Sequence, residues 1–121
     1  MKTRLLIVTI AIAAVLIPAI AFASTANTNQ IAAKKTSGVN KINAEISWFN
    51  KEITIINAKK NITTDRKSFL INIVNNDITI MNQMKTDIQN ATDWATVRTD
   101  FNSITPVYDG LKSGIKSAVK A

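Results

Sequence analysis

Apolar residues recur at alternating intervals of three and four positions in separate segments of the chain. A further segment lies between two of these. When it is drawn as a helix with 100° per residue, most of its apolar residues fall on one face. Each segment is therefore predicted to be an α-helix with one apolar face. The apolar series are Val39, Ile42, Ile46, Phe49, Ile53 and Ile56; Leu70, Val74, Met81, Met84 and Ile88; and Val97, Phe101, Ile104, Tyr108, Leu111, Ile115 and Ala118.

The middle segment has an alternative interpretation. Its stretch FLINIVNNDITIMNQM, residues 69–84, also fits a β-hairpin that turns at residues 75–77. The hairpin explains only this short stretch, whereas the helix orders the whole run over 65–90. A two-stranded hairpin on its own is also marginally stable in water. We therefore predict a helix.

Short connections separate the helices. One connection ends at Thr64 and Asp65 and the next at Thr92 before Asp93, residue types that favour helix N-caps. Short loops make long helices antiparallel neighbours. The sequence predicts an all-α protein, an antiparallel up-down-up three-helix bundle with coiled-coil-like packing. Its domain spans 37–121, with helices near 37–60, 65–90 and 93–119.

The first residues have the layout of a secretory signal peptide. Lys2 and Arg4 precede an apolar run, and the small-x-small triplet AFA follows at 21–23. We expect a signal peptide at 1–23, cleaved after Ala23, and a secreted, periplasmic or cell-surface mature protein. The alternative is an uncleaved anchor, because the apolar stretch approaches the ~20 residues that span a bilayer.

Residues 24–36, STANTNQIAAKKT, have no sustained apolar period. We predict a flexible leader there. The chain has no cysteine, so no disulfide can stabilise the exported domain and apolar burial must do so. Of 15 Lys and Arg against 8 Asp and Glu, two basic residues lie in the signal peptide, which leaves the mature chain a net charge of +5.

Composition argues against catalysis. The chain has neither histidine nor cysteine, which removes the usual general base, thiol nucleophile and soft metal ligands. Its acidic residues are dispersed, and its three glycines form no phosphate-binding loop. Nucleic-acid binding would need a denser basic stripe with interleaved aromatic residues. We expect a protein that is not an enzyme, with no cofactor, no metal and no nucleic-acid partner.

Two residues interrupt the apolar faces. Asp77 falls near the centre of the apolar face of the second helix, where an unpaired carboxylate costs several kcal/mol. Antiparallel pairing brings the hydroxyl of Tyr108 or the ammonium of Lys51 within reach, and we predict a buried polar pair of Asp77 and Tyr108. Pro106 lies inside the third segment, yet the apolar period continues through it. A kinked but continuous helix is expected.

Two sets of residues are candidates for surface contacts. Trp48 and Ile55 lie far from the centre of the first apolar face and are predicted to face outward as a partner-binding site or a surface for self-association. Lys112, Lys116 and Lys120 share one flank of the last helix. They could bind an anionic membrane surface, or they could simply complement the helix dipole.

The segment ATDWATVRTDFNSITPVY, residues 91–108, resembles the uncharacterised secreted coiled-coil proteins common in small-genome bacteria. This chain has Asp109-Gly110 where that group usually has a basic residue after the tyrosine. The resemblance implies a secreted helical bundle without catalytic activity. It is carried by Thr92, Trp94, Ala95, Thr96, Val97, Arg98, Asp100, Phe101, Ser103, Ile104 and Tyr108.

These observations favour an exported, non-catalytic helical bundle that acts by binding or by structural presence at or outside the cell envelope. Its partner would be a protein or an envelope component. The alternative is a cationic protein that binds membrane or envelope surfaces through its lysine-bearing C-terminal helix.

Overall fold

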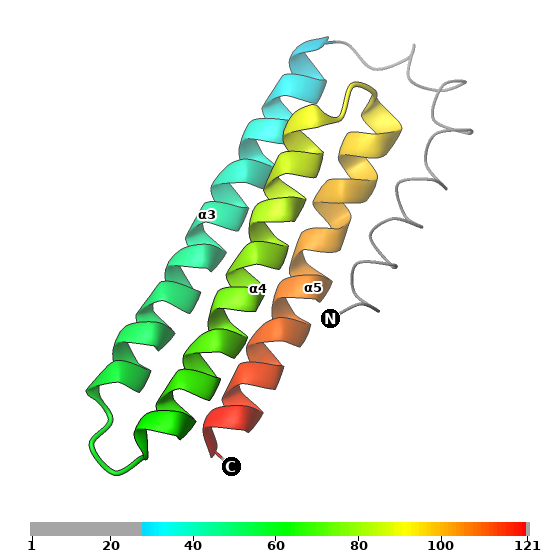
Figure 1. Cartoon of the computed structure of the whole chain (residues 1–121). Coiled ribbons are helices and arrows are strands. Elements are labelled where there is room, and N and C mark those ends of the chain that lie inside the picture. Colours follow the sequence, from blue (N-terminus) through cyan, green and yellow to red (C-terminus); the bar gives the residue numbers. More distant parts are fainter. Residues whose placement is uncertain (1–27, 121) are drawn as a thin grey trace.

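The computed structural model describes residues 28–120, so the predicted signal peptide and the choice between cleavage and anchoring lie outside the described residues. Three helices lie side by side with alternating direction (Figure 1). They are α3 (Thr28–Ala58), α4 (Thr64–Asn90) and α5 (Trp94–Lys120), and each one contacts the other two. The prediction of an all-α, up-down-up three-helix bundle is confirmed. In the part of the chain that the structure describes, no helix has the length and apolar character needed to cross a membrane.

The middle segment is a single helix, so the hairpin alternative for residues 69–84 is wrong. Its apolar face packs against the other two helices, which gives it far more buried area than an isolated hairpin could have. The largest side chains with less than 2 % of their surface exposed come from all three helices, and all of them except Val97 belong to one core cluster. They are Ile42, Phe49 and Ile56 of α3, Val74, Met81 and Ile88 of α4, and Val97, Ile104 and Ile115 of α5.

The N-caps lie one residue from their predicted positions. The side chain of Thr63 accepts a hydrogen bond from the backbone N–H of Arg66 at 3.1 Å, so Thr63 rather than Thr64 caps α4. At the next connection, Oδ1 of Asp93 accepts from the N–H of Thr96 at 2.8 Å. In both contacts the cap accepts from the backbone N–H of the third residue of the helix. That N–H has no hydrogen-bond partner within the helix.

The first helix begins much earlier than predicted. Residues 28–36 form its first turns, so the prediction of a flexible leader is wrong for this part; residues 24–27 lie outside the described range. Two lysines contribute contacts there that an apolar pattern cannot reveal. Nζ of Lys35 donates a hydrogen bond to the carbonyl oxygen of Ala91 at 2.9 Å. Nζ of Lys34 lies 3.9 Å from the centre of the Phe101 ring on α5.

The buried face of α3 is displaced from its predicted seam. Val39, Ile46 and Ile53 are only half-buried, whereas Gly38 and Glu45 are buried. A helix in a three-helix bundle faces two neighbours, so its buried face is wider than an a/d seam that serves one partner. The added width carries Gly38 and Glu45, which the apolar period does not include.

The third helix continues through Pro106, as predicted. Pro106 is exposed, so the carbonyl that it leaves unbonded one turn earlier lies on the solvent side. At the C-terminal end of α5, the Arg66 guanidinium donates a hydrogen bond to the carbonyl oxygen of Ala118. This contact joins the first turn of α4 to the last turn of α5 and places a positive charge where the helix dipole favours one.

Candidate functional site

Aromatic side chains of α3 and α5 meet where these two helices pack together. The ring centres of Trp48 and Tyr108 are 6.2 Å apart, and Phe49 lies 5.3 Å from Trp48 and 5.7 Å from Tyr108. All three pairs are edge-to-face, an arrangement that adds about 0.5–1.5 kcal/mol per pair beyond the burial of area. Phe49 is fully buried and the other two rings are half-buried, so the cluster reaches from the core to the surface.

A lysine covers the outer part of this cluster. Nζ of Lys112 lies 5.2 Å from the centre of the Trp48 ring and 5.5 Å from that of Tyr108, within range of a cation–π interaction with both. We call the surface formed by Glu45, Trp48, Tyr108, Asp109 and Lys112 the α3–α5 strip. Its aromatic rings, its ammonium and the exposed carboxyl group of Asp109 offer the contacts typical of a binding surface.

The position of Trp48 corrects a prediction. Trp48 does not face outward; it is half-buried and packs against the core, because the buried face of α3 is displaced toward α5. Ile55, two turns further along the same flank, is 50 % exposed, as predicted. The two residues therefore differ in accessibility: Ile55 has half of its surface in solvent, and Trp48 has less.

Glu45 contributes a carboxyl group inside the strip. It is only 8 % exposed, and its Oε1 atom has no hydrogen-bond partner among the described residues. Burial raises the pKa of Glu45 above its ordinary 4.5, the charge of Lys41 opposes this shift, and the charge of Asp109 on α5 adds to it. A buried acid with an unbonded oxygen was not expected from the sequence, in which Glu45 is one of the dispersed acidic residues.

The predicted buried acid on α4 is in place. Asp77 is 3 % exposed and interacts with at least one other group. Tyr108, its predicted partner, is half-buried on α5, with its ring held between Trp48 and Phe49. The pairing of Asp77 with the Tyr108 hydroxyl stays a prediction. Lys51, the alternative partner, is exposed.

The three C-terminal lysines are not equivalent. Lys112 is half-buried over the aromatic rings, whereas Lys116 and Lys120 are exposed. An anionic surface would therefore meet two free ammonium groups and one that must leave its cation–π contacts to take part. In the predicted lysine flank, Lys112 therefore packs on the aromatic rings, and Lys116 and Lys120 face solvent.

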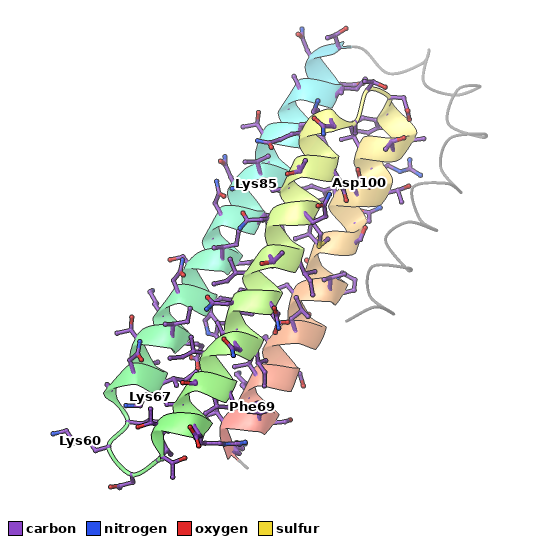
Figure 2. All side chains as sticks on the ribbon, in the orientation of Figure 1. Lys60, Lys67, Phe69, Lys85 and Asp100 are labelled. Atoms are coloured by element: carbon purple, nitrogen blue, oxygen red, sulfur yellow. The ribbon has the colours of Figure 1, made fainter. Side chains whose placement is uncertain are left out.

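Three acidic residues lie near the connection between α4 and α5. Asp87 is one turn before the end of α4, Asp93 caps α5, and Asp100 lies two turns into α5. Figure 2 shows Asp100 on α5 in the half of the bundle that contains this connection. Burial raises the pKa of Asp100 from 3.8 to about 6, and the charges of Asp87 and Asp93 add to the shift. Along the sequence these carboxylates are dispersed, so their proximity was not predicted.

Another exposed apolar side chain was also missed. Phe69 of α4 is 53 % exposed, and the guanidinium of Arg66 lies over its ring at 5.5 Å. Figure 2 shows Phe69 near the opposite end of the bundle from Asp100. Phe69 comes one position before Leu70, which begins the apolar series of α4. This spacing could have indicated a side chain at the edge of the apolar face.

The structure also has a shallow pocket between α3 and α4. It has a volume of about 260 Å³ and is lined by Lys35, Thr36, Val39, Asn40 and Gln89. The Lys35 ammonium near it is already bonded to the carbonyl of Ala91. Over residues 28–120, no group of three or more acidic side chains has an arrangement that could hold a metal ion.

Comparison of the chain with models of protein families, with curated proteins and with solved structures finds no match. The resemblance of residues 91–108 to secreted coiled-coil proteins therefore stays a prediction. Function must be argued from the geometry of the bundle itself.

Proposed function

We propose that the protein is an exported helical bundle that acts by binding a partner at or outside the cell envelope, and that the α3–α5 strip with neighbouring Ile55 is its contact surface. The observation that carries the proposal is the position of Trp48. Its ring packs on Tyr108 and under Lys112 yet keeps part of its surface in solvent.

The composition of the strip supports this choice of surface. Tryptophan and tyrosine are enriched at energetically important interface positions, where a fixed ring needs little further ordering on binding. Edge-to-face contacts with Phe49 and Tyr108 hold Trp48 in place before any partner arrives. The half-exposed Ile55 extends the apolar surface along α3.

The predicted signal peptide supports export, and the N-terminal pattern on which it rests is independent of the bundle. A non-catalytic role is supported by composition: without histidine or cysteine, the strip has two carboxyl groups, one phenol and one ammonium, and no histidine base or thiol nucleophile.

The proposal can be tested by saturable binding of the purified protein to cell envelopes isolated from its source. The test variants are Trp48→Ser and Ile55→Ser, and the control is Phe69→Ser, which removes an equally exposed apolar side chain on another helix. Loss of binding by tenfold or more in the Trp48 variant, with the control unchanged and both folded by circular dichroism, supports the strip. Equal binding by all three variants contradicts it.

A second candidate function is binding to anionic surfaces through α5, which the exposure of Lys116 and Lys120 favours. Co-sedimentation with anionic vesicles separates it from the first. Salt-sensitive binding that is lost when Lys112, Lys116 and Lys120 become glutamine, and that survives Trp48→Ser, supports the lysines. Binding that is lost only in the Trp48 variant supports the strip.

A further inference from the structure

Helix α5 packs against two helices, and each of these interfaces contains a carboxyl group that is buried or half-buried. On the α3 side this is Glu45, buried with one oxygen unbonded among the described residues. On the α4 side it is Asp100, half-buried on α5 within electrostatic range of Asp87. An ionised carboxylate in such a place lacks the solvation that water would provide, so docking of α5 must work against its charge.

The charged groups around Asp100 do not neutralise it. From α4 it faces Asp87, and from the connection Asp93, both of the same sign. Two lysines of α3 that contact the α4–α5 connection and α5 have other partners, Lys35 the carbonyl of Ala91 and Lys34 the Phe101 ring. On α5 itself, Arg98 is exposed to solvent.

The charged groups around Glu45 act in opposite directions. Lys41, one turn earlier on α3, favours its ionised form, and Asp109 of α5 opposes it. Lys112 of α5 lies over the aromatic rings of the strip. On α4, the acid Asp77 is also buried and interacts with at least one other group. Burial is thus the main influence on Glu45, and it favours the neutral form.

We propose that α5 is a pH-sensitive element of the bundle: with Glu45 and Asp100 neutral it seats fully against α3 and α4, and their ionisation loosens it. The two groups lie on different interfaces of the same helix, so both act on the position of α5. The α3–α4 hairpin contains only one of them and is not affected in the same way.

The direction of the effect follows from linkage. The pKa of Asp100 is about 6 in the folded protein and 3.8 without the fold, so the folded state binds the proton more tightly. Stability therefore rises as pH falls through 6 toward 4 and is lost as pH rises through 6. The raised pKa of Glu45 adds a contribution of the same sign above its ordinary 4.5.

Trp48 provides a local reporter of α5, because its ring contacts Tyr108 and Lys112 of that helix. Replacing the other tryptophan, as Trp94→Phe, leaves Trp48 as the only source of tryptophan fluorescence. The experiment measures acrylamide quenching of Trp48 without denaturant, and the urea midpoint, from pH 8 to pH 5. From pH 8 to pH 5 we expect the quenching of Trp48 to fall and the urea midpoint to rise. The equilibrium constant between loosened and seated α5 should increase about tenfold in favour of the seated form, after allowance for the partial exposure of Asp100.

The test variants are Glu45→Gln and Asp100→Asn, alone and together, in the same background; both keep the shape of the side chain and remove its charge. The double variant should be more stable than the parent at pH 8 and should show little change in quenching between pH 8 and pH 5. Glu52→Gln, at a carboxyl group of the next turns of α3, is the control and should keep the full pH response. If Glu45→Gln impairs folding, the Asp100→Asn variant alone tests the proposal by the same two measurements.

Two outcomes would overturn the proposal. Quenching of Trp48 that does not depend on pH, even with a shifting urea midpoint, would mean that α5 is not the element that responds. A pH response of unchanged size in the double variant would mean that other groups produce it.

Discussion

Gly38 of α3 lies directly against Ile88 of α4. A Cβ atom at Gly38 would collide with Cδ1 of Ile88, and it would also lie 3.4 Å from Phe101 and 3.5 Å from Ile104 of α5. The missing side chain lets all three helices meet at one level of the bundle. Glycine is unfavourable within a helix, so its presence here reflects this close approach.

Gly38→Ala should destabilise the protein by about 1 kcal/mol. Alanine gains about 1 kcal/mol in helix propensity over glycine, but forcing a methyl group into a packed core costs about 1–3 kcal/mol. Urea denaturation followed by circular dichroism measures the change. Ile88→Val removes the colliding Cδ1 atom, so adding it to Gly38→Ala should restore stability, although alone it should cost about 0.5–1.5 kcal/mol. Additive losses would contradict the steric explanation.

Gly110→Ala and Gly114→Ala should each stabilise the protein by about 0.5–1 kcal/mol. Both glycines are exposed inside α5, and a Cβ at either position would meet nothing within 4 Å. Alanine therefore lowers the conformational entropy of the unfolded chain without new collisions. The measurement is the thermal midpoint, which should rise in both variants. A fall in either would show that α5 needs glycine there for a reason other than space.

The predicted pair of Asp77 and Tyr108 can be tested with a double-mutant cycle. Tyr108→Phe keeps the ring contacts with Trp48 and Phe49 and removes only the hydroxyl. If the hydroxyl donates to Asp77, this change should cost about 1 kcal/mol in the parent and nearly nothing after Asp77→Leu. We also expect Asp77→Leu to keep or raise stability, because leucine suits a site that is almost fully buried.

Independent effects at these two positions would rule out the pair. The same cycle with Lys51→Met then tests the alternative partner. Since Lys51 is exposed, a coupling energy there should be smaller and should fall with added salt.

Asp93→Ala should cost more at pH 5 than at pH 8. The change removes the N-cap of α5, with its hydrogen bond to the N–H of Thr96, at a cost of about 1 kcal/mol. It also removes a negative charge that acts on Asp100, which helps only while Asp100 is ionised, above its pKa of about 6. Asp93→Asn is the control, because asparagine keeps the cap and removes the charge. It should be neutral at pH 5 and stabilising at pH 8, as measured by urea denaturation.

The helices could be predicted from the sequence because each apolar face extends over several turns. The order and direction of the helices followed from the short connections. The ends of α3 were less predictable. Its first turns have contacts from Lys34 and Lys35 to a ring and a carbonyl of other elements, and such contacts leave no trace in an apolar period.

The candidate site was predicted only in part, for a related reason. An a/d seam describes a helix with one partner, and α3 has two. Its buried face includes Gly38 and Glu45, which no apolar period would select. Once this face is included, Trp48 lies at its edge and not on the outside. The approach of Asp87 and Asp100 likewise depends on how α4 and α5 pack, which the spacing of charges along the chain does not reveal.

The brevity of the two connections, residues 59–63 and 91–93, has a kinetic consequence. Helices that follow each other in sequence pack together, so most of the core forms between segments that are close along the chain. Proteins with such low contact order fold in microseconds to milliseconds. In a chain that emerges from its N-terminal end, α3 can therefore pair with α4 before α5 is complete, so the apolar faces of these two helices are exposed only briefly.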